Sequence, residues 1–183
     1  DEFIERCKKG EAVGISYGLH EYNKATMGMH LGNLSLLAYS VNVGKTNTMF
    51  SNFVLDYAMQ GQEVFIYSNE TDKYDFQTFL LVNVLSKKYG IHKITKNKLK
   101  NGKLTEEQWE QIKVAQDFIN ENIKPLITVK YPKSHNMKEF VSYVRRYAYR
   151  GVKYFFMDTM KSDEAGSAQS VGLLVDQSRT IYE

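Results

Sequence analysis

Residues 34–46 read LSLLAYSVNVGKT, an apolar run followed by a short polar loop that ends in Gly44-Lys45-Thr46. A helical pattern of apolar residues follows at once, so the sequence predicts a strand, a loop and a helix in that order. A loop in this position directs backbone N–H groups at an anion, and the helix dipole adds positive potential there. We therefore expect a phosphate-binding loop, in which Lys45 reaches the outer phosphates and the Thr46 hydroxyl binds Mg²⁺.

The match to the full phosphate-loop pattern, G-x-x-x-x-G-K-[ST], is incomplete because Tyr39 stands at the first glycine. The alternative interpretation is an ordinary strand-to-helix turn with a solvated lysine. The apolar strand before the loop and the helix after it favour the phosphate site. The candidate phosphate-binding residues are Asn42, Val43, Gly44, Lys45, Thr46 and Asn47.

The composition describes one globular domain of 183 residues, of which 43% are hydrophobic and 25% charged. No apolar run approaches the ~18 residues that span a bilayer, so we expect no membrane partner. Cys7 is the only cysteine, which excludes an intrachain disulfide and favours a reducing, cytoplasmic location. The four histidines show no metal-ligand spacing, and a net charge of +3 is too small to predict nucleic-acid binding by itself.

Strand patterns and helix patterns alternate along the chain. We expect strands at 33–39, 64–67, 126–129 and 152–157, and helices at 46–60, 74–89, 106–121, 137–148 and 171–181. A capping box at residues 105–108 marks the start of the third of these helices. Residues 2–9 indicate a short polar helix or arm, residues 13–32 an irregular segment, and the five lysines within residues 93–103 an exposed loop. The alternation predicts parallel strands with helices on both faces and ligands at the carboxyl ends of the strands.

All three candidate functional positions fall at such strand ends. Residues 154–158 are four apolar residues followed by an acid, the Walker B form, in which Asp158 would be held beside Mg²⁺. The alternative is a buried strand whose next residue caps a turn. Glu70 follows the strand at 64–67 and could orient and deprotonate an attacking water, although it could equally cap the next helix. Residues 44–46, Glu70 and Asp158 support one another as a site, because one fold would bring these three strand ends together.

Five motifs resemble, in order and spacing, those of the RecA-type motor domain of DnaB-like replicative helicases. Residues 28–34 (GMHLGNL) resemble the family's G-L-x-P-G-D/N-L lead-in, and residues 40–46 (SVNVGKT) resemble its R-P-S-M-G-K-T loop. Residues 68–73 (SNETDK) are similar to the S-L-E-M-S-K motif, which carries the family's catalytic glutamate. Residues 102–109 (GKLTEEQW) resemble the G-x-L-T-x-x-x-W segment, and residues 156–161 (FMDTMK) stand where the family has V-V-D-Y-L-Q.

This resemblance implies a RecA-like P-loop domain of α/β fold over residues 13–183, after an arm or linker of residues 1–12. It implies the ATP-hydrolysing motor of a hexameric replicative helicase that moves on single-stranded DNA, with ATP and Mg²⁺ bound. The matching positions imply Glu70 and Lys45 as catalytic residues and Thr46 and Asp158 at the metal. The implied partners are other copies of the chain, a primase and a helicase loader. The family's sensor residue, arginine finger and DNA-binding loop would lie past residue 183, so we expect the domain to be incomplete at its C-terminus.

The chain also departs from the family's pattern. Tyr39 stands where the family commonly has a small residue, Val41 replaces the loop proline, and residues 159–161 replace Tyr-Leu-Gln. Two alternative functions stay open. One is an ATP-dependent regulator or recombinase-like ATPase that assembles without unwinding. The other is a nucleotide-binding interaction module, if the departures abolish turnover.

Overall fold

Strand β1 (Val64–Ser68) is the middle of a parallel sheet, between β2 (Ile127–Lys130) and β3 (Tyr154–Asp158). All five of its residues are buried, as expected for a strand that is covered on both faces. Ser68, its last residue, pairs with Asp158, the last residue of β3. The predicted parallel arrangement is therefore confirmed.

The structure is a computed structural model, and it describes residues 2–10, 13–33, 35, 40, 44–133 and 137–158. Most of the predicted strand at 33–39 and the whole predicted helix at 171–181 lie outside these residues. None of the helices within the described residues is long and apolar enough to cross a lipid bilayer.

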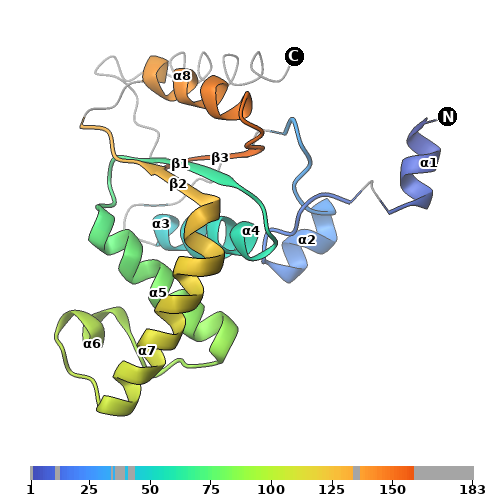
Figure 1. The fold of residues 1–183 in the computed structure, drawn as a ribbon. Helices are drawn as coiled ribbons and strands as arrows, with labels where there is room; N and C mark the ends of the chain where they lie inside the picture. The colour runs from blue at the N-terminus through green and yellow to red at the C-terminus, as the bar shows by residue number, and fades with distance from the viewer. Residues whose placement is uncertain are drawn as a thin grey trace.

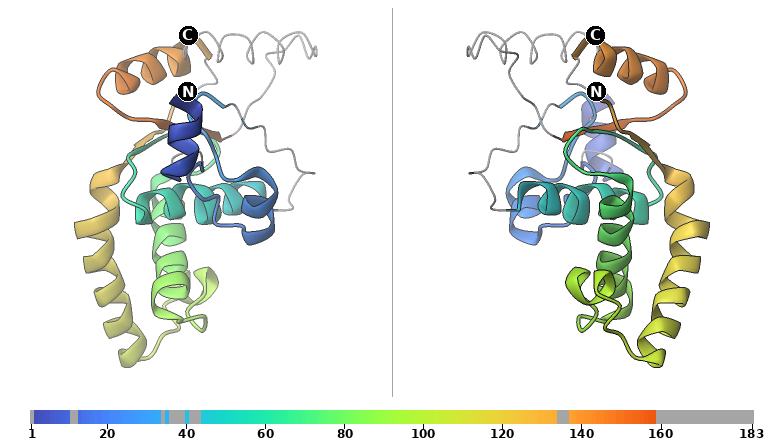
Figure 2. Two further views of the ribbon diagram at one scale, coloured as in Figure 1. Left: turned by 90° about the vertical axis from the view of Figure 1, so that its right-hand side faces the viewer. Right: turned by 90° about the vertical axis from the view of Figure 1, so that its left-hand side faces the viewer.

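Helices cover both faces of the sheet. Figure 1 and Figure 2 show α8 on one face and α3, α4 and α5 on the other, whereas α1 stands apart from the sheet. The helical elements are α1 (Glu2–Lys8), α2 (His20–Thr26), α3 (Lys45–Thr48), the π-helix η1 (Met49–Val54), α4 (Leu55–Met59), α5 (Lys73–Tyr89), α6 (Lys96–Lys100), α7 (Glu106–Phe118), the π-helix η2 (Ile119–Ile123), the 3-10 helix η3 (Lys124–Leu126) and α8 (Met137–Ala148). The capping box predicted at the start of α7 is present.

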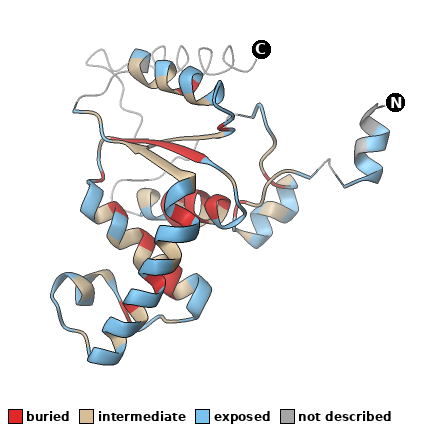
Figure 3. Ribbon diagram, viewed as in Figure 1, coloured by how far each residue is buried: buried red, intermediate tan, exposed pale blue. Residues whose placement is uncertain are grey.

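Alternate residues of β1 supply two separate cores. Val64 and Ile66 belong to the larger core, which η1, α4, α5 and α7 complete on one face. Phe65 and Tyr67 belong to a smaller core on the other face, against Val152 and the aromatic side chains of α8. Figure 3 shows this burial along β1 and in the helices that pack beneath the sheet. The two cores fix the strand ends, on which the candidate site depends.

The elements α3, η1 and α4 form one continuous helix, as predicted from residue 46 to 60, but its middle turns are π-helical. Leu55 N–H donates to the Phe50 carbonyl, five residues back, where an α-helix would use the Ser51 carbonyl. The Lys87 ammonium of α5 donates to that Ser51 carbonyl at 2.6 Å and forms an ion pair with Asp56 at 2.7 Å. A side chain from a neighbouring helix thus stabilises the irregular turn.

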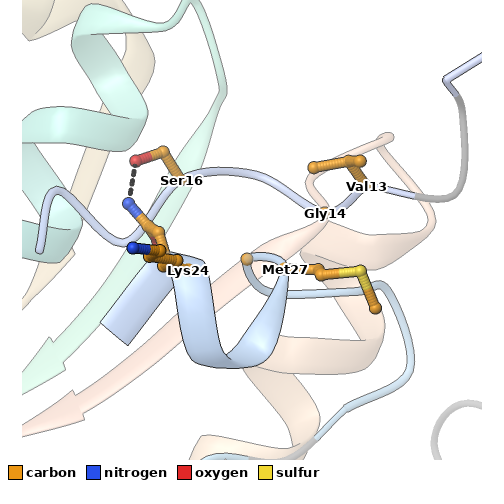
Figure 4. A pocket seen from close by; sticks show the side chains of 7 residues that line it. Val13, Gly14, Ser16, Lys24 and Met27 are labelled. Carbon is orange, nitrogen blue, oxygen red and sulfur yellow. Dashed lines mark hydrogen bonds between the residues drawn. The ribbon is translucent and has the colours of Figure 1, made fainter. Parts of the chain in front are cut away.

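The prediction that residues 13–32 are irregular is wrong in part, because they contain α2 and an antiparallel bridge between Ile15 and Met29. The helix has no buried residue and no side-chain cap, so its sequence carries little helical signal. Asn23 holds it in place by accepting from Tyr17 N–H and donating to the Ser16 hydroxyl, each at 2.6 Å. Figure 4 shows the second of these bonds beside a pocket that Val13, Gly14, Ser16, Asn23, Lys24, Met27 and Gly28 line. None of these residues is a predicted site residue.

The prediction of an exposed loop at residues 93–103 is also wrong in part, because this segment contains α6. Thr95 caps the helix by accepting from Lys98 N–H, and Ile94 just before it is buried in the larger core. Most of the lysines are exposed, and they obscured the two apolar residues that pack against the larger core, Ile94 and Leu99.

Candidate nucleotide-binding site

The first predicted feature is the start of the helix that follows the glycine-lysine-threonine sequence. Gly44 has φ 90°, in the left-handed region that favours glycine, and it turns the chain directly into α3. Thr48 N–H then donates to the Gly44 carbonyl at 2.9 Å, which closes the first helical turn. The first N–H groups of a helix have no partner within it, so an anion is stabilised at this end.

Asp158 is the centre of the site. It ends β3, is 1% exposed, and its carboxylate accepts three hydrogen bonds from hydroxyl groups of the described residues. Thr46 Oγ1 donates to Oδ1 at 3.1 Å, whereas Ser68 Oγ and Thr71 Oγ1 donate to Oδ2 at 3.1 and 3.3 Å. These bonds offset the cost of burying the carboxylate. Its three partners come from two other segments of the chain. The alternative interpretation, in which the acid caps the turn after its strand, concerns residues that lie outside the described ones.

Lys45 brings the helix start and the two strand ends together. Its ammonium lies 3.9 Å from Glu70 Oε2 and 3.9 Å from Asp158 Oδ1. Its side chain is 28% exposed and that of Glu70 is 38% exposed, so both groups reach solvent. A cation in this position can turn toward an anion that arrives from solution.

Glu70 lies in a turn that is held in place at both ends. Thr71 N–H donates to Ser68 Oγ at 3.3 Å, and Asn69 N–H donates to the Asp158 carbonyl at 3.1 Å. The cap of the following helix α5 is Asp72, whose carboxylate accepts from a backbone N–H of the first turn. The alternative interpretation of Glu70 as that cap is therefore wrong, and its side chain is 38% exposed.

The structure brings four of the predicted site residues together: Lys45, Thr46, Glu70 and Asp158. Gly44 precedes them directly, whereas Asn47 is exposed in the first turn of α3 and shares none of these contacts within the described residues. Asn42 and Val43 lie outside the described residues.

Two residues of the site, Ser68 and Thr71, were not predicted from the sequence. The sequence feature that could have indicated them is the presence of a hydroxyl residue on each side of Glu70.

The donor set fits a magnesium ion that is bound together with phosphates. Within the described residues there is no group of three or more His, Cys, Asp and Glu side chains that could hold a metal. Mg²⁺ bound with phosphates usually takes only one or two protein oxygens and keeps several waters. The Thr46 hydroxyl and the Asp158 carboxylate, 3.1 Å apart, offer such oxygens at the start of the helix.

Comparison with known proteins agrees with this geometry. The model of the family described as DnaB-like helicase C terminal domain matches residues 14–172. Among solved structures, the ATPase domain of a phage protein has a TM-score of 0.80 at 16% identity, over 99% of this chain and 64% of that one. A DnaB-like replicative helicase, described with its interactions with primase, has a TM-score of 0.78 at 16% identity, over 99% of this chain and 43% of that one. No curated protein sequence matches the chain.

The chain therefore spans less than two thirds of either solved chain. At 16% identity the two structures establish the fold. The predicted α/β, RecA-like fold, with a mainly parallel sheet and helices on both faces, is confirmed.

Proposed function

Because the chain belongs to the family of DnaB-like helicase C-terminal domains, we propose that it is the ATP-hydrolysing motor domain of a hexameric replicative helicase that translocates on single-stranded DNA. One observation carries the proposal: Lys45, Thr46, Glu70 and Asp158 converge at the carboxyl ends of β1 and β3. Thr46 and Asp158 are 112 residues apart in the chain, yet they share a hydrogen bond. Ligands of open α/β sheets bind at this edge.

Each of the four residues has a role that follows from its surroundings. Lys45 exchanges its two carboxylate neighbours for the outer phosphates of ATP, beside the N–H groups of the first helical turn. Thr46 and Asp158 hold Mg²⁺, which when bound neutralises charge on the phosphates. Glu70 accepts a proton from the attacking water, because its carboxylate reaches solvent beside the lysine.

We extend the proposal to the partners that the family implies. These are single-stranded DNA, further copies of the chain in a ring, a primase and a helicase loader. The description of one similar structure includes interactions with primase, which supports the primase partner by analogy. A cytoplasmic location and an arm of residues 1–12 remain predictions.

Substitution of the lysine tests the nucleotide site. We expect Lys45→Ala to lose most of the affinity for a fluorescent ATP analogue, because the phosphates lose their cation. The domain should stay folded, since Asp158 keeps its three hydroxyl donors. Lys103→Ala is the matched control, because this lysine is exposed in the turn after α6. Unchanged affinity in Lys45→Ala would exclude the phosphate-binding loop.

Turnover with and without single-stranded DNA separates the motor from its alternatives. Turnover that rises with DNA supports the motor. Turnover that ignores DNA supports a regulator or recombinase-like ATPase, and nucleotide binding without turnover supports an interaction module.

A further inference from the structure

The two oxygens of Asp158 have different partners. Oδ2 accepts from Ser68 Oγ, at the end of β1, at 3.1 Å and from Thr71 Oγ1, in the turn that follows, at 3.3 Å. Oδ1 accepts from Thr46 at 3.1 Å and lies 3.9 Å from the Lys45 ammonium. One oxygen therefore contacts the interior, and the other contacts the residues of the nucleotide site.

The interior contacts are shielded from water. Ser68 and Asp158 are each 1% exposed and Thr71 is 8% exposed, so water competes little for these hydrogen bonds. Ser68 Oγ also accepts from Thr71 N–H at 3.3 Å, which leaves its hydroxyl proton directed at Asp158. The orientation of the donor is thus set by the backbone of the same turn.

A carboxylate at the end of a strand can rotate about its side-chain bonds. Two hydroxyl donors on one oxygen oppose that rotation and keep the other oxygen at the nucleotide site. Partners of this kind orient metal ligands, and their loss typically lowers metal affinity. Thr71 stands where the family motif that resembles residues 68–73 has methionine, so the second hydroxyl is a feature of this chain.

We propose that Ser68 and Thr71 are positioning residues, which hold Oδ2 of Asp158 so that Oδ1 faces the magnesium ion of the bound nucleotide. This inference rests on the proposed function, in which Asp158 serves the metal. Both residues are buried on the Oδ2 side of Asp158, so we expect their effect to be confined to the part of nucleotide binding that depends on Mg²⁺.

The test uses three threonine variants in the complete protein. Thr71→Val removes the hydroxyl and keeps the shape, whereas Thr71→Ser keeps the hydroxyl. Thr78→Val is the control, because the Thr78 hydroxyl donates to the Tyr74 carbonyl within α5. Each variant is titrated with a fluorescent, non-hydrolysable ATP analogue without metal, and then with MgCl₂ at a fixed analogue concentration.

We expect Thr71→Val to lower the apparent Mg²⁺ affinity by on the order of tenfold, with the metal-free affinity for the analogue unchanged. Thr71→Ser should restore the Mg²⁺ affinity, Thr78→Val should resemble the wild type, and Ser68→Ala should change in the same direction as Thr71→Val. If a thermal melt shows that Ser68→Ala is unfolded, the comparison of Thr71→Val with Thr71→Ser tests the proposal by itself.

Two results would overturn the inference. One is wild-type Mg²⁺ affinity in Thr71→Val. The other is an equal loss of analogue affinity with and without metal, which would mean that the hydroxyl supports the fold of the site in general. Failure of the proposed function gives a different result, because the wild type would then bind the analogue no better with MgCl₂ than without it.

Discussion

Glu70 and Asp158 are both acids at the ends of neighbouring strands, but their surroundings suit them to different tasks. Asp158 is 1% exposed and held by three hydroxyl donors. The Glu70 side chain is 38% exposed, and Lys45 lies 3.9 Å from it. A carboxylate with fixed donors suits a metal, whereas one that reaches solvent can take up and release a proton.

The first prediction concerns Glu70. We expect Glu70→Gln to bind Mg-ATP normally and to hydrolyse it about 10²–10⁴-fold more slowly, because the amide keeps the shape and loses the base. A steady-state phosphate-release assay on the complete protein measures the turnover. Glu63→Gln, an exposed glutamate before β1, is the control. Unchanged turnover in Glu70→Gln would place the base elsewhere.

The four converging residues could be predicted from the sequence because each follows a recognisable apolar strand or precedes a helix. Ser68 and Thr71 could not, since a hydroxyl has many possible partners. Their partner is decided by the register that sets Ser68 opposite Asp158 across β1 and β3. A pattern along one segment contains no information about that register.

Among the elements, the π-helical turn of η1 depends on α5. The Lys87 side chain is 27% exposed and that of Asp56 is 18% exposed, and the ammonium also donates to the Ser51 carbonyl. We expect Lys87→Met to lower the free energy of unfolding by about 1–3 kcal/mol, because a buried carbonyl and a carboxylate lose their donor. Urea titration measures the change, with Lys103→Met as the control. Equal stability of the two variants would show that the turn needs no support from α5.

Ion pairs between Asp75 of α5 and two lysines of α6 should make the stability of the domain depend on pH. Hydrogen bonds from Lys100, and next from Lys96, lower the pKa of Asp75 below its ordinary value of 3.8. A pKa that is lower in the folded state contributes stability above the unfolded value, and this contribution is lost as the pH falls through the folded value.

We therefore expect Asp75→Asn to destabilise the domain by less than about 1 kcal/mol at pH 7, since the group is close to solvent. The difference from the wild type should begin to shrink as the pH falls below 3.8 and vanish only below the lowered pKa of the folded state, and it should also shrink at high salt. Urea titrations at several pH values measure it, and a difference that persists in acid would contradict the ion-pair explanation.

The long helices with clear apolar periodicity were predicted, whereas two short helices were missed. The helix α2 has no buried residue, and α6 has only five residues with lysines at three of them. The π-helical turn of η1 was missed for another reason, because a side chain of α5 stabilises it. Local sequence specifies the ends of long helices well, whereas short or irregular ones are decided by tertiary contacts.

At the scale of the whole molecule, the proposal of a ring makes turnover depend on association. An arginine finger from a neighbouring subunit contributes ~10³–10⁵ in rate in P-loop enzymes. We expect ATP turnover per chain of the complete protein to rise steeply with protein concentration, and to rise further with single-stranded DNA. Phosphate-release assays over a dilution series, beside light scattering, measure it. Fast turnover by a species that stays monomeric would contradict the ring.

The strand order β2-β1-β3 has a consequence for the nascent chain during synthesis. The middle strand is synthesised first of the three, and both neighbours that the sheet gives it arrive much later. Ribosomes add roughly 5–20 residues per second, so β1 waits on the order of 5–20 s until β3 has been made. During that time its apolar residues and backbone edges are open to other nascent chains, a recognised route to aggregation. We therefore expect a chaperone to shield this segment until Asp158 has been added.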